Sequence, residues 1–170
     1  LNEYNGVEPG SYLNGGGKDE LDGATDSKLG RIQGNGGAWM EFIVTGTGTG
    51  NTTVDMRGWT FTITNDDQTR ILHLSDHLSL ATIPAGTILT LVEDATIADT
   101  GFNLLSNLHL QGFGWTNIWM HDPILIDQSA STHPHSPAIG SRNTRVTVTA
   151  SDDSVLYGPS GESVGTRAVS

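Results

Sequence analysis

The fold is decided by a stretch that opens with Trp39-Met40-Glu41-Phe42-Ile43-Val44 and ends at Asp94. It contains four apolar runs, and each run is closed by glycine, asparagine, aspartate or proline. Short apolar runs between turn residues are typical of consecutive β-strands. The clearest run is Trp59-Thr60-Phe61-Thr62-Ile63, in which large apolar residues alternate strictly with threonine. This alternation predicts strands with one buried face and one face open to water, as in an antiparallel β-sandwich.

The same pattern predicts which side chains form the core and where the chain turns. Trp39, Trp59, Phe61 and Ile63 are expected to be largely buried, because they lie on the inward faces of alternating strands. A final hairpin is predicted from Arg145 onward. An exposed hairpin loop is expected at residues 45–53, and tighter turns are expected at residues 65–67, 151–153 and 158–161.

In their order, these pieces resemble the lamin-tail domain, an immunoglobulin-like β-sandwich found at the end of nuclear lamins and widely in secreted bacterial proteins. The resemblance implies an all-β, two-layer immunoglobulin-like sandwich with a non-catalytic role in attachment or assembly. It rests on an opening strand, a Trp-x-Glu-Phe strand, a Gly-Trp strand start, an Ile-Pro-Ala-Gly-Thr turn and the final hairpin, at residues 1–4, 39–42, 58–59, 83–87 and 145–162.

Length and composition are consistent with this fold and predict a single domain over residues 1–170. The chain has 22 glycines and only 16% charged residues, which suits short strands joined by tight turns better than a helix bundle. A loop-rich insertion is expected from about residue 94 to residue 143, with a short helix within residues 102–110. Residues 8–37 form a long Gly/Asp/Asn-rich loop in this interpretation, and residues 162–170 form an edge strand or a linker tail.

The charge of the chain argues against a nucleic-acid partner. The net charge is −11, from 19 acidic and 8 basic residues, whereas phosphate backbones are bound by clusters of lysine and arginine. In this respect the chain differs from the eukaryotic lamin tails that it resembles. Cysteine is absent, and no transmembrane segment or signal peptide is recognised. With a chain that opens on Leu1 instead of Met, this composition predicts a mature exported protein, extracellular or at the cell surface.

A group of acidic residues in the Gly-rich loop is the candidate metal site. Calcium takes six to eight hard oxygen ligands, and carboxylates in a glycine-rich loop supply them. The residues lack the regular spacing of a known calcium loop, so a solvated acidic loop is the favoured alternative. No cofactor is expected to be required beyond this structural calcium. The candidate calcium ligands are Asp19, Glu20, Asp22 and Asp26.

Two tryptophans are the candidate ligand-binding residues. Trp115 and Trp119 lie four residues apart, which places both on one face of a strand or a helix. An exposed pair of this kind stacks against sugar rings. Core packing explains the same residues and is the favoured interpretation, because large aromatic side chains dominate sandwich cores.

Catalytic interpretations are weaker. His73 and His77 have the spacing of a helical zinc pair, but their surroundings predict strand and turn. His133 and His135 flank a proline, and no third ligand is fixed nearby by the sequence. Glu41 lies in a strand, where a structural role is favoured over a catalytic one. The Gly-x-Ser-x-Gly elbow of serine hydrolases is absent. The sequence therefore predicts a protein that is not an enzyme.

The predicted function is that of a non-catalytic extracellular or cell-surface module for attachment or self-assembly. Its partners would be itself, other surface proteins or a polysaccharide, and the first strand, at residues 1–5, is placed to pair at a sheet edge. One alternative is a carbohydrate-binding accessory module, which needs an exposed tryptophan pair. A second alternative is a metal-dependent enzyme, which needs at least three converging His and Asp side chains.

Overall fold

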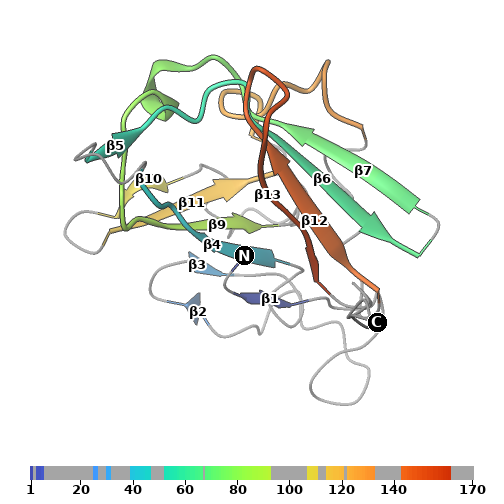
Figure 1. Cartoon of the computed structure of the whole chain (residues 1–170). Helices are drawn as coiled ribbons and strands as arrows, with labels where there is room; N and C mark the ends of the chain where they lie inside the picture. The colour runs from blue at the N-terminus through green and yellow to red at the C-terminus, as the bar shows by residue number, and fades with distance from the viewer. Residues whose placement is uncertain are drawn as a thin grey trace, which may run out of the picture.

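Two β-sheets lie face to face and hold the core between them (Figure 1). Almost all regular structure in the described residues is β-strand, apart from one 3-10 turn, η1 (Leu78–Leu80). The predicted all-β fold is therefore confirmed. The computed structural model describes residues 1, 3–5, 25–26, 30–31, 39–46, 52–66, 68–92, 107–110, 114–120, 122–132 and 143–161.

The larger sheet has five strands in the order β1-β4-β9-β11-β10. Its neighbouring strands are antiparallel except β9 and β11, which run parallel, so the sheet is mixed where an antiparallel one was predicted. The predicted opening strand is present and pairs with β4 at the sheet edge. The strands are β1 (Glu3–Asn5), β4 (Trp39–Ile43), β9 (Ile88–Val92), β10 (Asn107–Leu110) and β11 (Trp115–Trp119).

The smaller sheet has four antiparallel strands in the order β13-β12-β6-β7. Both predicted turns at its ends are present. Asp66 turns the chain between β6 and β7 with a φ of 49°, and Asp153 turns it between β12 and β13 with a φ of 65°. These strands are β6 (Thr60–Asn65), β7 (Gln68–His73), β12 (Arg145–Thr149) and β13 (Val155–Gly161). Two short pairs complete the list, β2 (Thr25–Asp26) with β3 (Gly30–Arg31) and β5 (Thr53–Val54) with β8 (Ile83–Pro84).

The core joins the two sheets through an aromatic pair. The rings of Phe42 on β4 and Phe61 on β6 meet edge to face, with centroids 5.2 Å apart and planes at 62°. This is the arrangement that the quadrupoles of two aromatic rings favour. Buried aliphatic and methionine side chains from both sheets surround the pair: Met40, Ile63, Leu72, Leu89, Leu91, Ile118, Val146 and Val148.

The face of β4 that enters the core is opposite to the predicted one. Met40, Phe42 and Val44 are buried, whereas Trp39 shares the outer face with Glu41 and is half-buried. Both faces of this run carry large apolar residues, so alternation alone does not choose between them. Glu41 decides, because a carboxylate inside the sandwich would lose its hydration. The prediction that Trp39 is largely buried is therefore wrong.

The predicted inward face of β6 is correct for its strand residues. Phe61 and Ile63 are buried, with 1% and 0% of their surfaces exposed. Trp59 precedes the strand and is only half-buried, because it lies where the core opens to the surface. The sequence therefore predicts more burial for Trp59 than the structure shows. Replacing Trp59 by alanine should cost less stability than replacing Phe61.

The predicted hairpin loop at residues 45–53 is wrong. The strands on either side of it, β4 and β6, belong to different sheets, so this segment passes from one sheet to the other. On the way, β5 pairs with β8 instead of extending a hairpin. A polar Gly/Thr run predicts a change of direction, but the partner of the following strand depends on how the whole core packs.

Three further segments differ from expectation. Asn107–Leu110 is strand β10, although a short helix was expected there, and it pairs with β11. Both strands come from the predicted loop-rich insertion, so part of that segment is built into the larger sheet. Residues 158–161 continue β13 instead of forming a turn, and a register shift between Val146 and Val148 accommodates the extra residue as a β-bulge. Most of residues 8–37, and all of residues 162–170, lie outside the described residues.

One edge of the smaller sheet is covered by the chain itself. The Ile71 amide on β7 donates to Thr132 Oγ1 over 2.8 Å, and the His73 amide donates to Ser131 Oγ over 2.9 Å. The Thr132 amide donates back to the Ile71 carbonyl. These bonds satisfy backbone groups that an open edge would offer to another strand. In the described part of the chain, β13 is the other edge of this sheet, and Val155 and Leu156 are exposed there by 63% and 47%.

Asp127 organises the turn that covers β7. Its Oδ1 accepts hydrogen bonds from the Ser129 hydroxyl at 2.6 Å, the Ser129 amide at 2.9 Å and the Ala130 amide at 3.2 Å. The bond from the Ser129 hydroxyl, followed by the backbone amides, lowers the pKa of Asp127. Hydrogen bonds to a carboxylate favour its charged form.

Replacing Asp127 by alanine should lower the thermal midpoint at pH 7, because the turn loses its acceptor. The lowered pKa means that this contribution is complete above the ordinary aspartate value of about 3.9 and is lost as the pH falls through the folded value. Circular-dichroism melts between pH 7 and pH 2.5 should therefore show the gap to wild type closing in acid. Asp127→Asn keeps an acceptor oxygen and serves as the control. A gap that is constant with pH would contradict the role of the charge.

Candidate functional site

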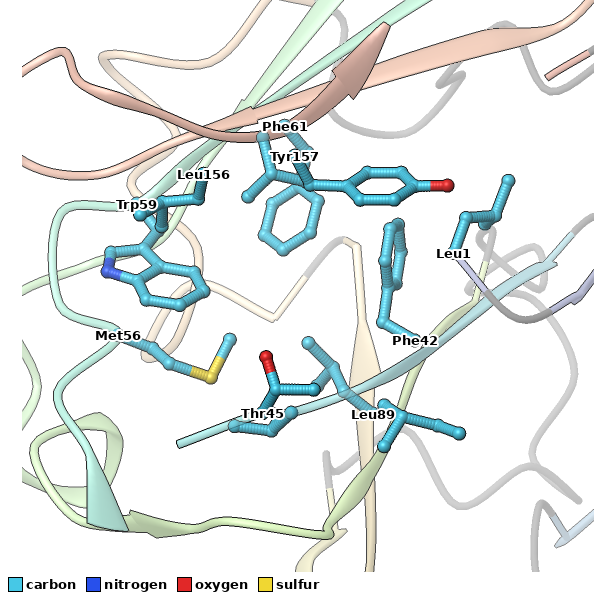
Figure 2. Close-up of a pocket in the computed structure, with 12 residues that line it drawn as sticks. Leu1, Phe42, Thr45, Met56, Trp59, Phe61, Leu89, Leu156 and Tyr157 are labelled. Atoms are coloured by element: carbon cyan, nitrogen blue, oxygen red, sulfur yellow. The ribbon is translucent and has the colours of Figure 1, made fainter. Parts of the chain in front are cut away.

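An apolar pocket opens between the two sheets beside edge strand β13 (Figure 2). Its volume is about 290 Å³. Phe42 and Leu89 from the larger sheet line one wall, and Phe61 and Val148 from the smaller sheet line the other. The aromatic pair that joins the sheets therefore also forms the inner end of the pocket. Side chains from the two sheets fill the space between them only in part at this side of the sandwich.

The rim of the pocket combines residues that are far apart in the sequence. Leu1, Trp59, Leu156 and Tyr157 all contribute, and Trp59 and Tyr157 are half-buried. In Figure 2 the Tyr157 hydroxyl points toward Leu1, and the Trp59 ring nitrogen points in the opposite direction, so both polar atoms lie near the edges of the labelled group. Their hydrocarbon faces are thus turned to the pocket, and their polar atoms are turned to its outside.

The chemistry of the pocket suits an apolar group. Among the described residues that line it, none carries a charge on its side chain, and the hydroxyl of Thr45 is one of its few polar groups. An apolar cavity of about 150 Å³ is large enough to hold a benzene molecule. The pocket therefore has room for a group the size of a phenylalanine or leucine side chain. Such a group gains about 25 cal/mol for each Å² of apolar surface that it buries.

A second, more open pocket shares Trp59 with the first. It has a volume of about 780 Å³ and is acidic, with Asp55, Asp76 and Asp152 in its lining. All three aspartates are exposed. They come from the segment before β6, the segment after β7 and the turn between β12 and β13. Trp59 lines both pockets, so the apolar site and the acidic one adjoin at this residue.

One of the three aspartates is neutralised within the acidic pocket. Arg57 Nη2 lies 2.6 Å from Asp55 Oδ2, and Arg57 Nε lies 3.0 Å from Asp55 Oδ1. The hydrogen bond from the Arg57 side chain lowers the pKa of Asp55. Both groups are well exposed, so the pair contributes little to stability. Asp76 and Asp152 remain to give the pocket a net negative charge.

A row of polar residues crosses the outer face of the larger sheet. Glu41, Thr90 and Asn117 lie side by side on β4, β9 and β11, and Glu3 and Asn107 occupy the next register positions on β1 and β10. Thr90 and Asn117 are buried, and Asn117 Oδ1 has no hydrogen-bond partner among the residues that the structure describes. A buried amide oxygen without a partner lowers the stability of the fold by about 1–3 kcal/mol, which makes this row a candidate site in addition to the two pockets.

The tryptophan candidates are placed on one strand, as their spacing predicts. Trp115 and Trp119 begin and end β11. Trp119 exposes only 2% of its surface, which leaves it no open face for a sugar ring, but it lies on the face of β11 opposite to Ile118 and outside the core cluster between the sheets. The side chain of Trp115 lies outside the described part of the structure. The sandwich encloses the opposite face of β11, with Ile118 in the core.

The other sequence candidates do not converge in the described part of the chain. Asp19, Glu20 and Asp22 lie outside the described residues, and Asp26 lies in the short strand β2. His77 caps η1, where its Nδ1 accepts from the Ser79 amide over 3.3 Å, and His73 lies in β7 as the sequence predicts. His121, His133 and His135 are outside the described residues. The residues that are described hold no group of three or more His, Asp or Glu placed to bind a metal.

Several site residues were not singled out from the sequence. Leu156 and Tyr157 carry no sequence signal beyond that of strand residues, and nothing in the sequence connects the hairpin turn at residues 151–153 with Asp55 or Asp76. Asn117 had a detectable signal, since it is an amide in the middle of the most aromatic run of the chain. The pocket residues had no signal that they form a pocket, because each is of a type that is common in strands or turns.

Comparison with protein-family models, curated proteins and solved structures finds no match to this chain. The site is therefore interpreted from its own geometry. Within the described residues, no helix has the length and apolar character required to span a bilayer.

Proposed function

We propose that this protein is a non-catalytic binding module that attaches an extracellular or cell-surface protein to its partner through the apolar pocket. The observation that carries the proposal is the combination of an open apolar pocket and a sheet edge beside it. The pocket has walls from both sheets, and edge strand β13 carries exposed Val155 and Leu156. A partner strand added to β13 would bring its side chains to the pocket mouth.

The apolar lining supports binding more than turnover. General acid–base catalysis needs a titratable side chain within hydrogen-bond reach of the reacting group. The described lining of this pocket offers aromatic and aliphatic surface instead. Concave apolar sites with few polar groups are the common form of a ligand pocket. The resemblance to lamin-tail domains of secreted proteins agrees with an attachment role.

Self-association through β13 is a second candidate, favoured by the same exposed edge. Strand β13 has two register shifts against β12, one between Val155 and Tyr157 and one between Tyr157 and Ser160, and such irregularities limit the length of β13 that a second copy could pair with. Sedimentation over a wide concentration range tests this candidate. A monomer at all concentrations would exclude it and leave the pocket proposal intact.

The pocket proposal is tested with a small aromatic probe, toluene, added to the isotopically labelled protein. We expect NMR shifts at Phe42, Phe61 and Tyr157 that saturate with probe concentration. Thr45→Phe should block binding, because Thr45 lies at the pocket and is exposed, so the fold should tolerate the larger side chain. Thr52→Phe is the matched control, since Thr52 is also exposed and is not part of the pocket. Equal binding by both variants, or no saturable shift at all, would overturn the proposal.

A further inference from the structure

The two pockets that share Trp59 differ in chemistry, and together they define the chemistry of one partner. The apolar pocket has a volume of about 290 Å³, and the acidic pocket is lined by Asp55, Asp76 and Asp152. A ligand that fills the first pocket and continues past Trp59 must meet the carboxylates of the second. Its chemistry is therefore constrained at two adjacent points.

We propose that the partner is a cationic polypeptide segment, which places an apolar side chain in the apolar pocket and an adjacent lysine or arginine in the acidic pocket. This inference rests on the proposed binding function and specifies its partner. The carboxylates of Asp76 and Asp152 attract the cation, and the indole of Trp59 offers it an aromatic face. Arg57, the arginine already present, forms its ion pair with Asp55 and also interacts electrostatically with Asp76, so three carboxylates and one arginine leave the pocket with a net negative charge for the partner.

The charge of the whole chain supports the same partner. A net charge of −11 attracts a basic segment over long range and opposes the approach of a second copy of this chain. Steering of this kind raises the association rate and weakens as salt is added. A basic partner segment is therefore favoured over self-association at this surface.

The strand geometry allows both contacts in one segment. β13 is an edge strand, and Leu156 and Tyr157 line the apolar pocket. The turn that leads into β13 supplies Asp152 to the acidic pocket. A peptide extended along β13 would therefore pass both sites, and residues two apart in an extended peptide face the same side.

The experiment measures binding of synthetic peptides to the full chain by calorimetry. One series carries a phenylalanine and an arginine separated by zero to three residues, and the controls replace arginine by glutamine or phenylalanine by alanine. We expect the best Phe/Arg peptide to bind about tenfold more tightly than its Phe/Gln control, since exposed ion pairs and a cation–π contact are each modest. The advantage should disappear in Asp76→Asn/Asp152→Asn and at high salt.

Asp153→Asn is the control for the Asp152→Asn half of the double variant, since it removes one carboxylate charge from the neighbouring exposed turn position, outside the acidic pocket. It should retain the preference for arginine. Equal binding of the Phe/Arg and Phe/Gln peptides would overturn the inference while the pocket function stands. Binding of toluene without binding of any peptide would also overturn it, whereas failure of toluene and peptides alike would remove the proposed function itself.

Discussion

Replacement of Phe61 by alanine is expected to lower the free energy of unfolding by about 3–5 kcal/mol, the usual cost of truncating a large aromatic residue in a core. Phe61 is 1% exposed and makes the edge-to-face contact with Phe42 that joins the two sheets. Its loss would also enlarge the apolar pocket, which already leaves part of this region unfilled. The neighbouring sheets can therefore do little to close the new cavity.

Urea unfolding followed by tryptophan fluorescence measures this effect. Leu78→Ala is the control, because Leu78 is 77% exposed and its truncation should change stability by less than about 0.5 kcal/mol. Phe61→Leu should fall between the two variants. A loss below about 1 kcal/mol for Phe61→Ala would show that the two sheets are not held together in the way described.

Substitution of Gly158 by alanine is expected to cost about 2–5 kcal/mol, from two separate effects. Gly158 has a φ of 93°, which residues with a Cβ rarely adopt. A Cβ at this position would also overlap the Val146 carbonyl oxygen and would lie 3.0 Å from Thr147 Cα. Both contacts are with the backbone of β12, so relief requires β12 and β13 to separate locally.

Gly86→Ala separates the two effects. Gly86 has a similar φ of 88°, but a Cβ there meets nothing within 4 Å. Its substitution should therefore cost only the backbone term of about 1–2 kcal/mol. Chemical denaturation of both variants makes the comparison, and the Gly158 variant should also show weakened protection from hydrogen exchange along β13. Equal losses in the two variants would refute the steric part of the argument.

The local sequence was sufficient to predict the buried face of a strand where only one of its two faces carries large apolar residues. The alternation of Phe61 and Ile63 with threonine places these two residues inward, and the structure agrees. The turn at Asp153 also follows from local chemistry, because the Asp152 carboxylate accepts the Ser154 amide within the turn itself. Interactions between near neighbours in the chain depend only on the local sequence, so they can be predicted before the fold is known.

Strand partners and the site were decided by tertiary structure. β4 has large apolar residues on both faces, and the need to keep Glu41 out of the core settled which face turned inward. The parallel pairing of β9 with β11 joins strands separated by residues 93–114, and no local pattern encodes such a partner. The net charge of −11 could be read from the composition, whereas the meeting of Asp55, Asp76 and Asp152 in one pocket with Trp59 could not.

The pockets show the physical reason for this division. Phe42, Trp59 and Tyr157 have side chains that would satisfy many sandwich cores, and only the packing of two sheets brings them around one incompletely filled space. Asp55, Asp76 and Asp152 are ordinary turn and loop residues that become a site when three segments meet. Sequence determines the chemistry of each side chain and the local backbone. The distances between remote side chains are fixed by the packing of the complete core, which no single segment contains.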